Sequence, residues 1–476
     1  MSPRVDVTHH GAAAAGGPLL FLNRTRGVTL GEWVVVRQAG LADRRGQVID
    51  AGEHATIIQL LDDTVGLAPD KAEVVLTGEV ATTVVGRELL GRAFDGHGAP
   101  VDGLPAPVGD ALLPIDGAPI NPIRRDRPRD FIETGISAID AMNTLVRGQK
   151  LPVFSGPGLP GLEIAARIVE WARAPRHEPF AVVFAAVGIT ARETRDFLDR
   201  VRASGALPRT VLYLNQASHP SVERLHAPRL ALTCAEHLAY ECGLHVLVVI
   251  ADMTHYCEAL REIATAREEI PGRRGYPGYM YTDLASLYER AGIIRGKPGS
   301  ITQIPILTMP DDDVTHPIPD LTGYITEGQI VLSRELHRRG VTPPIDVLPS
   351  LSRLMSGGIG KDRTRPEHRE WSDQLYASYA RGREARSMAA IVGESGLPPG
   401  DRRALQFAEA FEQQFINQPE GRRTIGETFA VGWRLLDTLP RDDLIRISDA
   451  TYTAHHAGDA AVPAHHAAEA ATGSPA

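Results

Sequence analysis

At 476 residues the chain is too long for a single hydrophobic core, so we expect two to four domains. Its 43% hydrophobic and 23% charged residues are ordinary for a soluble globular protein. The net charge of −9 argues against nucleic acid as a partner. No apolar run approaches the ~20 residues that cross a bilayer, and the N-terminus lacks a signal-peptide pattern. We therefore predict a cytoplasmic protein that contacts a membrane only through partners.

The N-terminal part favours β structure. Residues 1–17 are small and polar, and we expect them to be disordered. Residues 18–80 contain short apolar strands separated by turn glycines, a pattern that predicts a small β-barrel.

The central part, residues 81–350, begins with a segment rich in glycine and proline that connects two domains, and a different hydrophobic pattern follows it. Near-continuous apolar strands alternate with helical stretches, which predicts a parallel sheet covered on both faces. The expected strands lie at 151–154, 180–187, 211–214 and 246–250. In such sheets, ligands bind at the carboxyl ends of the strands.

The C-terminal part is predicted to be helical over residues 351–452, with helix-spaced apolar residues in 368–387, 405–416 and 424–439. Residues 453–476 are rich in alanine and histidine, and we expect a disordered tail that binds metal at most adventitiously. The fold class is therefore an α/β core with a parallel sheet, an N-terminal β-barrel and a C-terminal helical domain.

Three cysteines, Cys234, Cys242 and Cys257, are odd in number and lack the spacing of metal ligands. We interpret them as inert thiols in a reducing compartment. We predict no metal site on this chain.

Residues 151–163 carry a damaged phosphate-binding loop. A working loop reads G-x-x-x-x-G-K-[ST] between a strand and a helix. Gly156 and Gly161 keep the glycine frame, with Gly158 between them, but Leu162 replaces the lysine and Glu163 the hydroxyl residue. Leucine cannot neutralise phosphate, and at ~5 Å and an effective dielectric near 20 the Glu163 charge would repel one phosphate charge by about 3 kcal/mol. By itself, the frame could also be a plain strand–turn–helix connection.

Two further positions bear on catalysis. Ile189 follows the strand 180–187, and its apolar side chain cannot polarise water. Asp252 ends the strand 246–250 in the form of a magnesium-holding acid, although an ordinary polar strand end has the same pattern.

The stretches 131–140, 142–152, 155–160 and 252–284 resemble the B subunit of vacuolar/archaeal-type rotary ATPases. The resemblance covers about residues 18–450, and it implies that the α/β core is a P-loop ATPase-like parallel sheet. It also implies that Ile189 stands where catalytic members of the family carry a glutamate. Gly161 and Leu162 depart from the His-Asn pair expected there, and the two tails have no counterpart.

The resemblance implies a non-catalytic subunit in an alternating ring of three catalytic A and three B subunits. The ring surrounds a central shaft, connects to peripheral stalk subunits, and acts on a membrane ion-translocating sector from the cytoplasmic face. ATP or ADP is expected to bind weakly at the A–B interface, with Mg²⁺ held mainly by the A subunit. The loop 273–279 is expected to face the shaft.

Residues 343–353 resemble the family signature before a trans-acting arginine, and Arg353 is therefore the leading functional residue. In the family, the equivalent guanidinium contacts the γ-phosphate on the neighbouring A subunit. A planar, permanent cation suits spread phosphoryl charge. From the residues alone, an arginine paired with an acid at a domain boundary remains the alternative.

Two other functions remain open. One is a self-sufficient P-loop NTPase such as a hexameric helicase, against which Leu162, Glu163, Ile189 and the acidic charge argue. The other is a scaffold with no role at a nucleotide, which would have no need of Arg353. The direction of ATP turnover and the choice of protons or sodium ions do not follow from this sequence.

Overall fold

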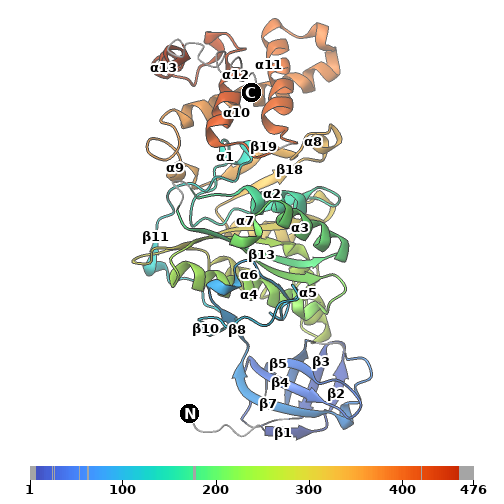
Figure 1. The fold of residues 1–476 in the computed structure, drawn as a ribbon. Helices are drawn as coiled ribbons and strands as arrows, with labels where there is room; N and C mark the ends of the chain where they lie inside the picture. Colours follow the sequence, from blue (N-terminus) through green and yellow to red (C-terminus); the bar gives the residue numbers. More distant parts are fainter. Residues whose placement is uncertain are drawn as a thin grey trace, which may run out of the picture.

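The computed structural model describes residues 7–23, 25, 27–52, 54–61, 64–174, 178–419 and 421–459. Figure 1 shows three layers along the molecule: a β-barrel, a central α/β domain and a helical domain. This arrangement confirms the predicted fold class. In the described part of the chain, no helix has the length and apolarity to cross a membrane.

The barrel is an antiparallel sheet in the order β1-β7-β4-β5-β6-β3-β2. Alternate side chains of its strands point inward, as in β4, whose burial alternates along Trp33–Val36, and they pack Leu20, Val34 and Ile58 into one core. The strands are β1 (Val7–His10), β2 (Ala14–Gly16), β3 (Leu19–Asn23), β4 (Glu32–Arg37), β5 (Arg44–Ala51), β6 (Ala55–Leu60) and β7 (Glu73–Val80).

The central sheet has the order β19-β18-β12-β17-β15-β13-β14-β9, in which β19 is antiparallel to its neighbour β18 and the other pairs are parallel. The four strands expected from the sequence are present. The strands are β9 (Ala93–Asp95), β12 (Val153–Ser155), β13 (Phe180–Ile189), β14 (Thr210–Gln216), β15 (His245–Ala251), β17 (Ser300–Thr308), β18 (Gly328–Leu332) and β19 (Ile345–Ser352). Four short strands complete the region: β8 (Thr82–Val85) pairs with β10 (Ala111–Pro114), and β11 (Arg125–Asp126) pairs with β16 (Gly292–Ile294).

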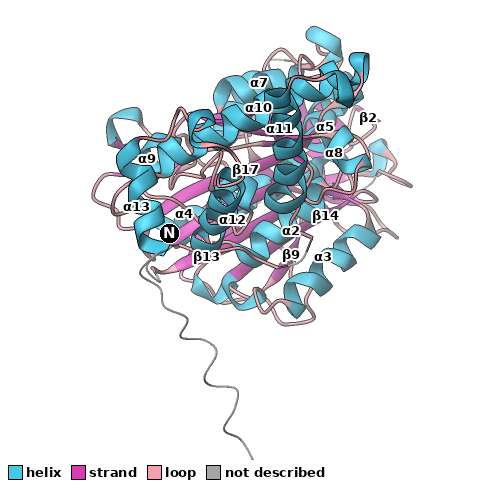
Figure 2. Cartoon of the chain, turned by 90° about the horizontal axis from the view of Figure 1, so that it is seen from above, coloured by secondary structure: helices cyan, strands magenta, loops and turns pink. Residues whose placement is uncertain are grey.

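Helices cover both faces of this sheet, as Figure 2 shows from above. Val182 and Phe184 of β13 join the core beneath α2 and α3, whereas Val183 and Ala185 join the core beneath α4 and α5. Both sets of side chains are buried, which is why the strand reads as one apolar run. The helices are α1 (Ser137–Asp140), α2 (Gly161–Trp171), α3 (Ala191–Ala203), α4 (Ser221–Tyr240), α5 (Met253–Ala266), α6 (Met280–Tyr288), α7 (Pro317–Ile325), α8 (Arg334–Arg338) and α9 (Met355–Gly358).

The C-terminal domain packs helices around an aromatic core. Trp371 is fully buried, and its ring lies 4.3 Å from that of Phe429. His368 is also fully buried, and its Nε2 hydrogen-bonds the carbonyl of Ala141, which ties this domain to the central one. The helices are α10 (His368–Val392), α11 (Pro399–Ala410) continued by a π-helix (Phe411–Ile416), α12 (Ile425–Leu436) and α13 (Asp449–Asp459).

The expectation of disordered ends is wrong for the parts that the structure describes. β1 pairs with β7, placing Val7 opposite Leu76, and β2 pairs with β3. At the other end, α13 runs to position 459, and His455 stacks on Trp433 with ring centroids 4.1 Å apart. Pairing and stacking with distant segments give these parts an order that their local composition does not indicate. Residues 1–6 and 460–476 of the predicted disordered ends lie outside the described residues.

Candidate functional site

The phosphate-loop segment lies at the carboxyl end of the central strand β12, where it turns into α2. Gly158 has φ +76°, a conformation that favours glycine. A Cβ on Gly156 would lie 1.9 Å from an oxygen of Asp312, and a Cβ on Gly161 would lie 3.1 Å from the hydroxyl of Ser155. The three glycines therefore shape a tight turn that larger residues would disrupt.

Two amides of this turn donate within the turn itself. Leu159 N donates to the Gly156 carbonyl at 3.0 Å, and Gly161 N donates to the Leu159 carbonyl at 2.9 Å. Pro157 and Pro160 have no N–H to donate. Since a working loop holds phosphates with free backbone N–H groups, this turn offers fewer donors than the glycine frame suggests.

An ion pair occupies the mouth of the turn. Arg334 at the start of α8 contacts the carboxylate of Asp312 at 2.8 Å and donates to the Pro157 carbonyl at 2.9 Å. The hydrogen bond from Arg334 lowers the pKa of the Asp312 carboxyl. A cation therefore lies beside this turn, but a carboxylate already neutralises it.

Glu163 is not the isolated charge that the sequence suggests. Its carboxylate accepts from Arg167, one turn later in α2, at 2.8 Å. Arg167 is buried and also donates to the carbonyl of Gln418 at 2.7 Å. The paired charge repels phosphate less than the ~3 kcal/mol of a free carboxylate. Leu162 packs against the core and contributes no charge.

The other acids and apolar residues near these strand ends have structural partners. Ile189 is 5% exposed and packs in the core, so it cannot polarise water. Glu193 on the next helix forms a capping box with Thr190. Asp252 caps α5 through the Thr254 amide at 2.7 Å and accepts from the amide and hydroxyl of Thr308. The Asp252 carboxylate therefore serves a helix end and a neighbouring strand.

Arg353 directly follows β19, the edge strand of the sheet, and its side chain is exposed. Its amide donates to the Glu327 carbonyl at 3.0 Å, and its guanidinium donates to the Thr326 carbonyl at 3.2 Å. Within the described ranges, no carboxylate lies at ion-pair distance from this guanidinium. The alternative of an arginine paired with an acid at a domain boundary therefore finds no support.

The strand register separates Arg353 from the phosphate loop of the same chain. Ser352 lies opposite Gly328, at the amino end of β18, and Glu327 N bonds the carbonyl of Lys150. Gly156 comes six residues after Lys150, which at ~3.3 Å per residue is about 20 Å along the sheet. The fold thus brings Gly156, Gly158 and Gly161 together and places Arg353 at the opposite end of the strands.

Sequence reasoning missed Asp312, Arg334 and Arg167, which fill the loop region. The acidic run 311–313 after an apolar strand was an available signal, because strand ends gather at one edge of a parallel sheet. Nothing in the local sequence links Arg334 to residues 156–157, since that contact depends on strand order.

The loop 273–279, expected to face a shaft, is held to the body by ion pairs. Arg273 pairs with Asp320 at 3.0 Å, and Arg274 pairs with Asp313 at 2.8 Å. Gly272 N donates to the Tyr276 carbonyl at 2.8 Å. These contacts hold the loop 273–279 in one conformation against the central domain.

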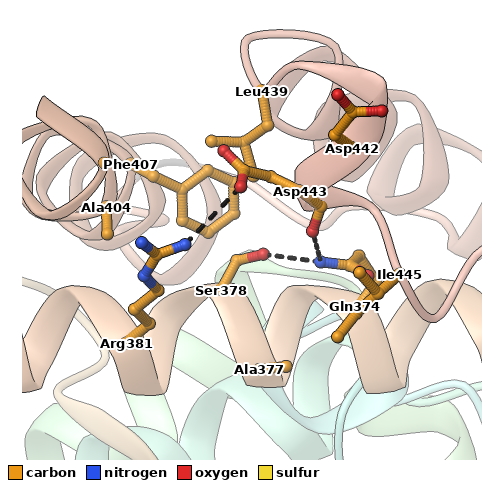
Figure 3. Close-up of a pocket in the computed structure, with 11 residues that line it drawn as sticks. Gln374, Ala377, Ser378, Arg381, Ala404, Phe407, Leu439, Asp442, Asp443 and Ile445 are labelled. Carbon is orange, nitrogen blue, oxygen red and sulfur yellow. Dashed lines mark hydrogen bonds and ion pairs between the residues drawn. The ribbon is translucent and has the colours of Figure 1, made fainter.

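A second concavity, of about 150 Å³, lies in the C-terminal domain and is drawn in Figure 3. Gln374 donates to the Ser378 hydroxyl at 2.9 Å and to the Asp443 carbonyl at 3.1 Å, while Arg381 lies 3.6 Å from the Asp443 carboxylate. Four of the polar residues that line this pocket thus pair with one another.

Three family models together match most of the chain. The model of the ATP synthase alpha/beta family, nucleotide-binding domain, matches residues 135–352, and the beta-barrel domain of the same family matches residues 14–78. The C-terminal domain of V and A type ATP synthase matches residues 357–456.

Similar proteins carry consistent names. A V-type ATP synthase beta chain of Anaeromyxobacter sp. (strain Fw109-5) is 61% identical over 444 residues, covering 93% of this chain and 96% of the relative. A V-type ATP synthase beta chain of Thermus thermophilus is 56% identical over 446 residues, covering 92% of this chain and 93% of the relative. Among solved structures, the ATP synthase subunit NeqB from Nanoarcheaum equitans matches with a TM-score of 0.70 and 40% identity, covering 89% of this chain and 100% of that one.

Proposed function

Because the chain belongs to the ATP synthase alpha/beta family and has the C-terminal domain of its V and A types, we propose that it is the non-catalytic B subunit of a V/A-type ATP synthase. In this role it supplies Arg353 in trans to nucleotide bound on a neighbouring catalytic A subunit. The complex makes or hydrolyses ATP in step with proton or sodium-ion transport across a membrane.

The observation that carries this proposal is the position of Arg353. Its guanidinium is exposed at a sheet edge, makes one hydrogen bond to a carbonyl, and lies about 20 Å along the strands from the chain's own loop. A guanidinium so placed has most of its five N–H donors free for an anion on another molecule. Phosphoryl-transfer enzymes use such arginines to stabilise charge that spreads over the γ-phosphate.

The chain's own loop supports a non-catalytic role. It lacks the lysine and the hydroxyl, has two prolines at positions where other residues would offer an N–H donor, and is bordered by the Asp312–Arg334 pair. ATP or ADP bound at the A–B interface is therefore held weakly by Gly156, Gly158 and Gly161, and Mg²⁺ is held mainly by the A subunit.

The proposed assembly is an alternating ring of three A and three B subunits around a central shaft, with peripheral stalk subunits outside it. The ring sits at the cytoplasmic face of the membrane and contacts the ion-translocating sector indirectly. The loop 273–279, fixed by its ion pairs, faces the shaft.

The test is to purify the chain alone and together with its A partner, and to compare native mass and ATP hydrolysis. We expect the isolated chain to hydrolyse no ATP above background and the mixture to form an active hexamer. Rapid hydrolysis by the isolated chain would favour a self-sufficient NTPase such as a helicase. Failure to form a hexamer with the A subunit would reject the assembly.

A further inference from the structure

A cluster of three side chains with metal-binding chemistry lies far from the phosphate loop, at the C-terminal end of α4. His237 Nε2 is 3.0 Å from a carboxylate oxygen of Asp110, and the Cys242 thiol completes the group. The three candidate ligand atoms lie within 4.8 Å of one another. His237 is 8% exposed, whereas 51% of the Asp110 side chain is accessible, so one side of the cluster is open to solvent.

Backbone geometry holds the three residues together. A Cβ on Gly109 would lie 2.5 Å from the Val85 carbonyl oxygen, and a Cβ on Gly86 would lie 2.9 Å from the Asp110 amide. The two glycines therefore allow the chain before β10 to press against the end of β8, which places Asp110 beside α4. Cys242 N donates to the His237 carbonyl at 3.0 Å, and this turn folds the thiol back toward the imidazole.

We propose that Asp110, His237 and Cys242 form a binding site for a zinc-type divalent transition-metal ion, with water as the fourth ligand. Thiolate, imidazole and carboxylate are the three side-chain ligands that Zn²⁺ takes, and a tetrahedral site places its ligand atoms about 3.3–3.8 Å apart. The observed cluster meets this spacing with small side-chain rotations. A thiolate and a carboxylate together balance the charge of a divalent ion.

The donor set distinguishes this site from an ordinary histidine–carboxylate hydrogen bond. Such a bond needs no third group, whereas here the thiol of Cys242 joins it from the turn that follows α4. Arg87 donates to the Cys242 carbonyl at 2.7 Å, so the segment that carries the thiol is tied to the same β8–β10 region that carries Asp110. A bound ion would therefore clip this region, which follows the barrel, to the end of a core helix (Figure 1).

The experiment uses Co²⁺ as a spectroscopic probe on the purified full-length chain, with a phosphine reductant that contributes no thiol. We expect one equivalent of Co²⁺ to give the near-ultraviolet sulfur-to-cobalt charge-transfer band and the visible bands of tetrahedral coordination, and Zn²⁺ to displace it. Cys242→Ser should abolish the charge-transfer band. Asp110→Asn, at a solvent-exposed position, should weaken Zn²⁺ binding by roughly tenfold or more, because even groups that only orient ligands contribute about 10–100-fold.

Background binding by other histidines is controlled with the double variant His455→Ala/His456→Ala, which removes the cluster that these two form with Asp437. This variant should keep the full charge-transfer band. Circular dichroism confirms that each variant is folded. Absence of a charge-transfer band from the wild-type chain, or a band that survives Cys242→Ser, would overturn the proposal.

Discussion

Replacing Arg353 with alanine separates a functional role from a structural one, because the two predict very different sizes of effect. The side chain is exposed and, among the residues that the structure describes, makes a single hydrogen bond, to the Thr326 carbonyl. Loss of one such bond costs about 1 kcal/mol or less, and surface substitutions typically fall within ~0.5 kcal/mol. We therefore expect the Arg353→Ala chain to fold, and its melting temperature to change little.

The expected effect on turnover is far larger. Arginines that act in trans on a γ-phosphate contribute ~10³–10⁵ in rate, which corresponds to about 4–7 kcal/mol of transition-state stabilisation. Arg353→Lys keeps the charge but loses the planar fork that binds two oxygens at once, so it should restore only a small part of the rate.

The assay measures ATP hydrolysis by the reconstituted ring, with native mass and melting temperature recorded on the same samples. Arg192→Ala is the matched control, since the Arg192 side chain is 90% exposed on α3 and is paired only loosely, at 3.6 Å, with Asp196. It should retain normal turnover. A fully assembled Arg353→Ala ring that turns over at a near-normal rate would refute the role assigned to this guanidinium.

Two further predictions concern the C-terminal domain. A Cβ on Gly432 would lie 2.1 Å from the Trp371 ring, so Gly432→Ala should destabilise the protein by about 1–3 kcal/mol. Gly426→Ala in the same helix, where the nearest atom would be 3.9 Å away, should be neutral or stabilising. The melting temperatures of the two variants test this prediction, and equal shifts would disprove it. Burial lowers the pKa of His368 from 6.5 to about 4. At a pH between these two values the unfolded chain binds a proton at His368 that the folded chain does not bind. The free energy of unfolding therefore decreases by about 1.4 kcal/mol for each unit that the pH is lowered through this range. The urea midpoint of the wild type should therefore drop more between pH 6.5 and 5 than that of His368→Gln, and parallel curves for the two would contradict the assignment.

The sequence was sufficient for the fold class because its signals depend on local burial. A strand covered on both faces is mostly apolar, as β15 is after His245, and glycines mark the turns between the short strands of the barrel. The absence of the phosphate-loop lysine at Leu162 was equally readable, since this position lies at a fixed offset from the glycine frame.

The ends of the chain and the contacts around the loop could not be read in this way. β1 gains its order from pairing with β7, more than sixty residues later in the chain. Arg167 pairs with the Glu163 carboxylate, and the Asp312–Arg334 ion pair lies at the mouth of the loop. Each depends on which side chains a fold brings within a few ångströms.

The sequence alone thus determined the elements, their order and the missing chemistry, because hydrophobic period and residue type act over a few neighbouring positions. Only the tertiary structure decided that Arg353 and the phosphate loop lie at opposite ends of the strands, since that follows from strand register. It also brought Asp110 beside His237 and Cys242, across more than a hundred residues of chain. The spacing of residues in the sequence does not predict such contacts, because they form between distant segments whose positions are fixed by packing of the whole core.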